Sequence, residues 1–429
     1  MESDWKWPGT APDIVTQQVR IALDECRCPP WESASFGYPG TAPLQCAVQA
    51  MNAAIAVNSN NIGDHSLAFR TDGHEQTEHG FDGTQRMEQE AISRLVRLAG
   101  GEPTQIGGYL TEGGTAANTA GMWMGRNFLR SLDGDERILI ITTRLAHYSI
   151  LKAADLLGFS SSDIIYAPCN KQGEMDIEAL PELLDELQNN GCTKFLFVCT
   201  TGSTMLGSVD DIKTINRMRS DRKILSEGTA SYLHVDAAFG GFVLPFLADP
   251  VEFGFDCGAD SVTLDPHKMG GTPFGCGAIL YRKEFAQFVT VKAPYLNSEE
   301  DWTINGSRSG ANAAALWAVL QAKGYEQLSA RVQRCIQLRD YAAEQIATKV
   351  AFLRPHLGQT NQLCLEIIDH SVIDRLKKVV EGHPHYMHVA PFPKRFDDPT
   401  CQAGRALKMI LMPHHTHGMV DRFVEKIRQ

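Results

Sequence analysis

Residues 261–271 read SVTLDPHKMGG, a short apolar run that leads directly into ionisable residues and a glycine pair. The first four residues have the length and the β-branched content of a buried strand. Lys268 follows this strand closely, where an ammonium is costly to bury without a partner. It is therefore either a solvated surface residue or a desolvated amine, which can act as a nucleophile and form a Schiff base.

Four similar apolar runs lie on either side of this one, at 137–142, 194–200, 232–235 and 277–281. They alternate with helix-like segments, a pattern that predicts a large α/β domain with a mainly parallel sheet. In open sheets of this type, ligands bind beyond the carboxyl ends of the strands. The residues that follow each strand are therefore the candidates for a functional site.

Three further segments carry such residues. Asp236 ends one apolar run and precedes small residues, which suits either a carboxylate facing a flat ligand or a helix cap. His147 follows another run and is either a ring that stacks on an aromatic ligand or a satisfied structural histidine. The segment 111–118, TEGGTAAN, precedes a helix and is either a turn or a cradle of backbone N–H groups for an anion. Together with Lys268, these parts are the ones that hold pyridoxal phosphate.

Composition limits the remaining function classes. The 429 residues are 43% apolar, and 40 Lys and Arg against 51 Asp and Glu give a net charge of −11. An acidic chain disfavours unaided binding of nucleic acid or of an anionic membrane. No apolar run reaches the roughly 18 residues of a membrane span, and no signal peptide is recognisable. The odd, unpatterned set of 11 cysteines is not a disulfide framework, and no histidine cluster has the spacing of a metal site. We therefore expect a cytoplasmic protein without a metal.

With these residues in place, the chain resembles the group II pyridoxal-phosphate-dependent amino-acid decarboxylases, which share the fold of aspartate aminotransferase (fold type I). Segments 234–246 (HVDAAFGGFVLPF), 261–270 (SVTLDPHKMG) and 293–296 (APYL) are similar to archaeal tyrosine/aspartate decarboxylases. Other segments are similar to plant serine and bacterial histidine decarboxylases: 36–39 (FGYP), 60–64 (NNIGD), 147–158 (HYSILKAADLLG), 207–212 (GSVDDI) and 306–310 (GSRSG). The residue pattern divides the chain into a large domain at 59–314 and a small C-terminal α+β domain at 315–429. The resemblance implies that the large domain binds the cofactor and that the N-terminal segment at 1–58 makes substrate and dimer contacts.

The resemblance also implies a role for each matching residue. Lys268 would form the internal aldimine, Asp236 would pair with the pyridinium nitrogen, and His147 would stack on the ring. Loss of carbon dioxide from an L-amino acid would then leave a quinonoid carbanion that Asp236 stabilises. The other cofactor contacts would come from Gly114, Thr115 and His267 at the phosphate, from Ser203 or Thr204, from Ala238 under the ring, and from Gly306 and Ser307 of the partner in a homodimer.

Substrate contacts are less defined. Tyr38, His65 and Tyr295 are candidates, and the absence of an evident carboxylate-clamping arginine favours an uncharged substrate side chain. Two departures from the family stand out: Glu112 lies where relatives have an uncharged residue, and the 297–303 loop lacks the tyrosine that protonates Cα in aromatic-amino-acid decarboxylases. The proton donor is thus His147, Tyr295 or water. Alternative functions on the same scaffold are a carbon–carbon lyase, an aldehyde synthase and a non-catalytic cofactor-binding homologue.

Overall fold

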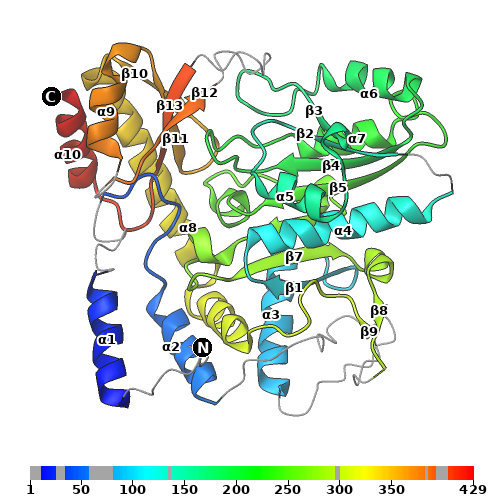
Figure 1. Cartoon of the computed structure of the whole chain (residues 1–429), viewed down its shortest axis with the longest axis horizontal. Helices are drawn as coiled ribbons and strands as arrows, with labels where there is room; N and C mark the ends of the chain where they lie inside the picture. The colour runs from blue at the N-terminus through cyan, green and yellow to red at the C-terminus, as the bar shows by residue number, and fades with distance from the viewer. Residues whose placement is uncertain are drawn as a thin grey trace, which may run out of the picture.

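A seven-stranded sheet forms the centre of the larger domain (Figure 1). The computed structural model describes residues 11–25, 34–57, 81–133, 137–294, 300–381, 385–392 and 404–429. Five adjacent strands are parallel to one another. The next strand runs antiparallel to both of its neighbours, one of which is the strand at the edge of the sheet. In spatial order the strands are β1 (Ile106–Thr111), β7 (Gly277–Arg282), β6 (Ser261–Leu264), β5 (Ala230–Ala237), β4 (Lys194–Thr200), β2 (Ile138–Thr142) and β3 (Ile164–Tyr166). The predicted α/β domain with a mainly parallel sheet is confirmed.

Helices cover both faces of this sheet, because alternate strand residues point to opposite sides. In β4, Phe195 and Phe197 pack into one apolar cluster, whereas Leu196 and Val198 pack into another. Each fully buried side chain of this size contributes about 1.5–3 kcal/mol. The first cluster includes residues of α3 (Asp82–Leu98), α6 (Leu180–Asn189) and α7 (Ile212–Ser220), and the second includes residues of α4 (Gly114–Ser131) and α5 (Ser149–Leu156).

The C-terminal part of the chain builds a second, antiparallel sheet. Its order is β10 (Leu353–Leu357), β11 (Gln362–Ile367), β13 (Gly404–Ile410) and β12 (Val389–Phe392). Pro355 and Pro391 lie in the two edge strands, where a residue without an N–H is tolerated. Helices α9 (Ile373–Val380) and α10 (His417–Arg428) complete the small core.

One long helix, α8 (Gly310–Lys349), runs between the two cores (Figure 1). Leu316 and Val332 pack in the core of the large domain, and Leu338 and Ile346 pack in that of the small domain. Gly324 interrupts the helix with φ 59° and ψ −176°, a conformation that glycine adopts most readily. The boundary expected at 314/315 falls inside this helix.

Two helices precede the large domain. The second, α2 (Gln45–Ala56), packs against α8, whereas the side chains described in α1 (Pro12–Glu25) are exposed. Sequence analysis did not anticipate α1, because its helical signal stands in a region rich in proline and glycine. No helix among the described residues is both long and apolar enough to cross a membrane.

Candidate active site

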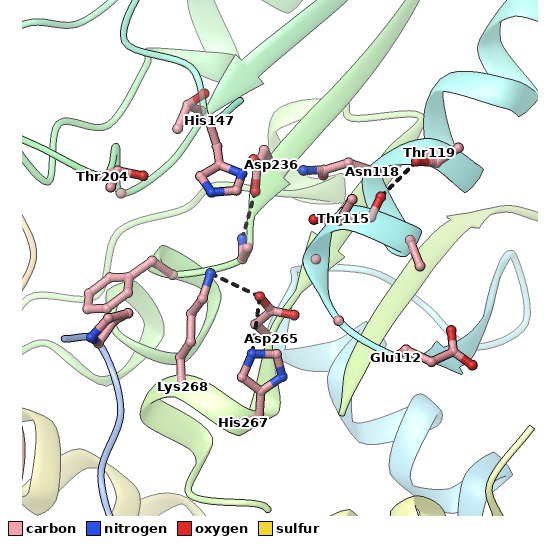
Figure 2. A pocket seen from close by; sticks show the side chains of 18 of the residues that line it. Glu112, Thr115, Asn118, Thr119, His147, Thr204, Asp236, Asp265, His267 and Lys268 are labelled. Carbon is pink, nitrogen blue, oxygen red and sulfur yellow. Dashed lines mark hydrogen bonds and ion pairs between the residues drawn. The ribbon is translucent and has the colours of Figure 1, made fainter. Parts of the chain in front are cut away.

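A cavity of about 620 Å³ lies where the carboxyl ends of β4, β5 and β6 meet the N-terminus of α4 and the small domain. Its volume is that of a site for a cofactor-sized molecule. Figure 2 shows side chains from separate elements converging on it. The sequence-predicted residues that line it are Gly114, Thr115, His147, Thr204, Asp236, Ala238, His267 and Lys268.

Lys268 lies in a single helical turn that follows β6. Its Nζ is 2.9 Å from Oδ2 of Asp265, and the two side chains are 22% and 3% exposed. The second oxygen of Asp265 has no hydrogen-bond partner among the described residues. The buried carboxylate therefore offsets the cost of placing an amine in the cavity and fixes the direction of that amine.

Asp236 is the penultimate residue of β5 and is 4% exposed. Its Oδ1 accepts a hydrogen bond from the backbone N–H of Ala238 at 3.1 Å, and its Oδ2 accepts one from Nδ2 of Asn118 at 2.9 Å. Each oxygen has a further lone pair, so the carboxylate can also accept a proton donor from the cavity. Sequence analysis did not assign Asn118, because a single amide in a helix carries no signal of the strand residue that it faces.

His147 follows β2 and contributes a neutral ring to the cavity. Burial lowers the pKa of its imidazole, while Asp236 acts in the opposite direction and Lys268 reinforces the decrease. Its Nδ1 is 2.8 Å from Oγ of Ser149, the first residue of α5. The hydroxyl and the backbone N–H of Ser149 thereby hold the imidazole ring in place.

The N-terminus of α4 opens towards the same cavity. Gly113, which precedes the helix, supplies no side-chain cap, so the first backbone N–H groups remain available for an anion. Glycine is required here: Gly113 has φ 148°, and a Cβ on Gly114 would lie 2.8 Å from Oδ2 of Asp265. Glu112 also lines the cavity, but it is exposed and its carboxylate points away from Lys268 (Figure 2).

His267 closes the cavity near Gly113. Its Nδ1–H donates to the carbonyl oxygen of Cys276 at 2.8 Å, which leaves Nε2 on the side of Asp265, 3.8 Å from Oδ2. Burial lowers the pKa of this imidazole. The ring also contacts Phe274, with 4.5 Å between centroids.

Other predicted site residues are placed differently. Thr204 lines the cavity, whereas the hydroxyl of Ser203 is engaged with that of Ser208 at 2.6 Å inside the loop. Gly306 and Ser307 are exposed and do not line the cavity of their own chain. Tyr38 is 39% exposed and does not line it either, although the adjacent proline does. His65 and Tyr295 lie outside the described residues.

Lys408 is a cavity residue that sequence analysis missed. It lies on β13 of the small domain, half-buried, and forms no ion pair with a carboxylate within the described ranges. Burial and the nearby Lys268 both lower the pKa of its ammonium. Gln362 on the neighbouring strand also lines the cavity, and its Oε1 has no partner among the described residues. The signal available in the sequence was a lysine within the apolar run RALKMIL.

These groups fit pyridoxal phosphate by their chemistry. An amine, a buried carboxylate and an imidazole face one cavity, and an uncapped helix N-terminus offers N–H groups to a phosphate. Within the described ranges, no group of three or more His, Cys, Asp or Glu side chains could hold a metal ion. The amine, the carboxylate and the free N–H groups suit chemistry at an amine bound to an organic cofactor.

Comparisons with known proteins agree with this chemistry. The family described as "Pyridoxal-dependent decarboxylase conserved domain" matches residues 120–364. The probable L-tyrosine/L-aspartate decarboxylase of Methanosphaera stadtmanae is 30% identical over 80% of this chain and 82% of its own length. The protein of the same description from Methanothermobacter thermautotrophicus is 33% identical over 83% of this chain and 86% of its own length.

A solved structure shows the same fold. The glutamate decarboxylase domain of diaminobutyrate-pyruvate transaminase and L-2,4-diaminobutyrate decarboxylase from Vibrio parahaemolyticus superposes with a TM-score of 0.79. The match covers 100% of this chain and 87% of that one at 19% identity. At this identity the likeness concerns the fold alone.

Proposed function

The chain belongs to the family of pyridoxal-dependent decarboxylases, and we propose that Lys268, Asp236 and His147 carry its reaction. It is an amino-acid decarboxylase whose cofactor is pyridoxal phosphate. The observation that supports the residue assignment is the convergence of the three side chains, each from the end of a different strand, on one cavity. Asp265, Asn118 and Ser149 fix their directions.

The residues divide the task by their chemistry. When bound, pyridoxal phosphate supplies an electron sink for the bonding pair that departing carbon dioxide leaves on Cα. Lys268 would hold the cofactor through Nζ, and the N-terminus of α4 with Thr115 and His267 would hold its phosphate. His147 would lie against the face of the ring. The carboxylate of Asp236 would keep a proton on the ring nitrogen, and its burial makes this electrostatic effect stronger than in water.

The substrate class is supported by the small-domain wall of the cavity. Every L-amino acid brings an α-carboxylate, and Lys408 is a cavity cation without a carboxylate partner within the described ranges. We assign the substrate's α-carboxylate to Lys408, with the amide of Gln362 beside it. The pair would orient the bond that breaks.

Replacing Lys408 with methionine should raise KM for the substrate about 10- to 100-fold, the cost of losing a charge-assisted hydrogen bond. Affinity for pyridoxal phosphate should stay unchanged, because we assign the phosphate to the N-terminus of α4 with Thr115 and His267, and not to Lys408. Steady-state kinetics and a cofactor titration measure the two effects. Lys408→Arg, which keeps the charge, should retain most of the affinity; an unchanged KM in Lys408→Met would contradict the assignment.

The function is tested by recording carbon dioxide release from the cofactor-loaded enzyme with each of the twenty L-amino acids. L-Tyrosine and L-aspartate come first, because the curated relatives are described as probable decarboxylases of these two. We expect one amino acid to release carbon dioxide with formation of its amine. Hydrogen peroxide in place of amine would indicate an aldehyde synthase, and no release with any amino acid would reject the proposal.

We further propose that the active unit is a homodimer. Gly306 and Ser307 are exposed, and they follow Ile304, which lines the cavity. Their neighbour Arg308 is buried, so the large domain holds the backbone next to the exposed pair in place. This supports a contact with the phosphate in the site of the second subunit. A sedimentation mass of one chain for the active enzyme would refute it.

A further inference from the structure

A buried polar network holds the carboxylate of Asp236, and it reaches the wall of the cavity at Asn118. Its centre is Asn118, which is 1% exposed in the second turn of α4. Nδ2 of Asn118 donates to Oδ2 of Asp236 and to Oγ of Ser149, both at 2.9 Å. Oδ1 of Asn118 is 3.0 Å from Nε2 of His234, whose Nδ1 is 2.7 Å from Oγ of Ser261. One amide thus contacts three buried side chains.

The chemistry of Asp236 sets the direction of every hydrogen bond in this network. An ionised carboxylate only accepts, so the NH₂ of Asn118 must face it and the amide oxygen must face His234. His234 must then carry its proton on Nε2, and its Nδ1 accepts from the hydroxyl of Ser261. Burial lowers the pKa of His234 to about 4, which keeps the ring neutral and able to play both roles.

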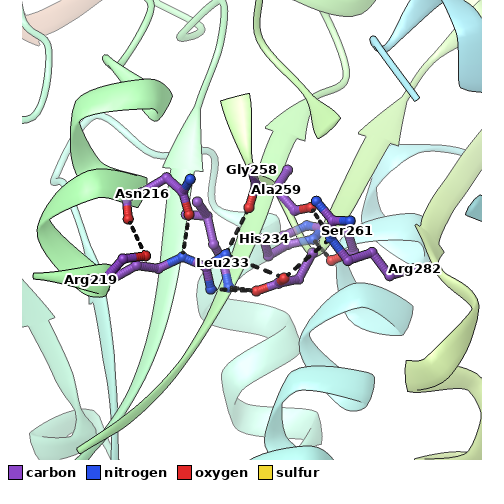
Figure 3. A network of polar contacts seen from close by, with 10 residues as sticks. Asn216, Arg219, Leu233, His234, Gly258, Ala259, Ser261 and Arg282 are labelled. Atoms are coloured by element: carbon purple, nitrogen blue, oxygen red, sulfur yellow. Dashed lines mark hydrogen bonds and ion pairs between the residues drawn. The ribbon is translucent and has the colours of Figure 1, made fainter. Parts of the chain in front are cut away.

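The backbone holds His234 and Ser261 in this arrangement. The two residues are directly opposite each other in the parallel pair of β5 and β6. Figure 3 shows Leu233 and Arg219 in the polar contacts beside them. Oδ2 of Asp260 accepts from the backbone N–H of Leu233 at 2.8 Å and pairs with Arg219 at 2.6 Å. Because Asp260 precedes Ser261 and Leu233 precedes His234, the register of the pair is fixed.

The helix that carries Asn118 is also held close to the sheet. Gly121 lies one turn further along α4, and a Cβ at this position would be 2.3 Å from Nδ1 of His234. Glycine therefore permits the close approach of α4 to β5. The contact brings the amide of Asn118 within reach of both Asp236 and His234.

The second N–H of Asn118 extends the network to the stacking histidine. Ser149 accepts this bond, so its own hydroxyl hydrogen is directed to Nδ1 of His147 at 2.8 Å. The backbone N–H of Ser149 approaches the same nitrogen at 3.3 Å. His147 consequently carries its proton on Nε2, away from Ser149.

We infer that Asn118 is a positioning residue that fixes the carboxylate of Asp236 towards the cofactor ring and selects the Nε2–H form of His147, with His234 and Ser261 holding its amide in place. The inference rests on the proposed role of Asp236. Asn118 lines the cavity, but its amide hydrogens and its amide oxygen are engaged by Asp236, Ser149 and His234, so it acts through these neighbours. Its contribution is to reduce the orientations that Asp236 and His147 can adopt.

The test compares pyridoxal phosphate affinity and histidine ring ¹⁵N spectra of the full-length protein. Asn118→Leu removes all three hydrogen bonds at similar volume, and it should weaken cofactor affinity about 10- to 100-fold, as expected for a lost hydrogen bond to a charged group. Asn127→Leu is the matched control, because this second asparagine of α4 donates to the carbonyl of Phe288 and accepts from Arg126, and none of these groups lines the cavity. It should leave affinity unchanged. In the wild-type spectrum, His234 and His147 should both be protonated at Nε2.

Asp236→Asn separates the inference about Asn118 from the proposed role of Asp236. If it weakens affinity and Asn118→Leu does not, the inference about Asn118 is wrong while the role of Asp236 stands. If neither weakens affinity, both are wrong. Should Asn118→Leu not fold, His234→Gln, which keeps a donor at the Nε2 position, must bind the cofactor more tightly than His234→Leu. Equal affinities, or a wild-type His234 protonated at Nδ1, would overturn the inference.

Discussion

Lys268→Ala should lower kcat/KM by at least about 10³-fold, because it removes the amine to which we assign the attack on the cofactor. The substitution also removes the amine that pairs with Oδ2 of the buried Asp265, whose Oδ1 has no hydrogen-bond partner among the described residues. The cofactor would then be held by its phosphate, by Asp236 and by stacking alone. Initial rates of carbon dioxide release with the identified substrate, at saturating cofactor, measure the loss.

Two controls separate the nucleophile from its charge. Lys268→Arg keeps a cation beside Asp265 but has no amine that can attack the cofactor, so it should fold as the wild type and be as inactive as Lys268→Ala. Borohydride treatment should attach the cofactor irreversibly to wild-type protein, at the peptide containing residue 268, and to neither variant. Retention of more than about a tenth of the activity in Lys268→Arg would show that another group performs the step.

The sequence predicted the central sheet and the residues at its edge for a physical reason. Buried parallel strands are short, continuous apolar runs, and the loops at their carboxyl ends must lie together. Lys268, Asp236 and His147 each follow such a run, so their convergence needed no knowledge of the helices. The strand at 106–111 was missed because Gly107 and Gly108 hide its β character. The edge strands β10 and β12 were missed because each contains a proline.

The residues that sequence analysis did not find act across long separations. Asn118 meets Asp236 from a different element, and its amide is distinguished only by the carboxylate that it faces. Lys408 enters the cavity from the small domain, 140 residues after Lys268 in the chain. Neither local propensity nor strand order predicts how the small-domain sheet is set against the large domain. Such contacts follow from packing of the whole chain, which the residue pattern of one segment does not contain.

A buried ion pair next to the exposed Gly306–Ser307 pair provides the largest expected effect on stability. Arg308 and Glu88 are 2% and 3% exposed in their side chains and form a two-point contact, Nη1 to Oε1 and Nη2 to Oε2. Oε1 of Glu88 also accepts from the backbone N–H of Leu110 at 2.8 Å, and the guanidinium lies 5.3 Å from the ring of Tyr109. The pair therefore joins α3, β1 and the segment before α8.

Replacing Arg308 with methionine should lower the free energy of unfolding by about 3–5 kcal/mol, because it leaves the carboxylate of Glu88 buried without its cation. Urea unfolding of wild type and variant measures the difference. The matched control is Arg354→Met, which breaks the exposed pair with Glu366 and should cost less than about 1 kcal/mol. The cost at Arg308 should fall sharply in the double variant Glu88→Gln, Arg308→Met, since glutamine can still accept from Leu110 and carries no charge.

The same variants distinguish a role of segment 306–308 in stability from a role in cofactor binding. If the segment 306–308 only stabilises the large domain, the double variant should regain both stability and cofactor affinity. If Gly306 and Ser307 reach the phosphate in the second subunit, the double variant should regain stability while its cofactor affinity stays low, because methionine cannot hold the segment against β1. Equal stability losses in Arg308→Met and Arg354→Met would instead mean that burial of the Glu88–Arg308 pair contributes nothing to stability. The claim that Arg308 fixes the position of Gly306 and Ser307 would then be wrong.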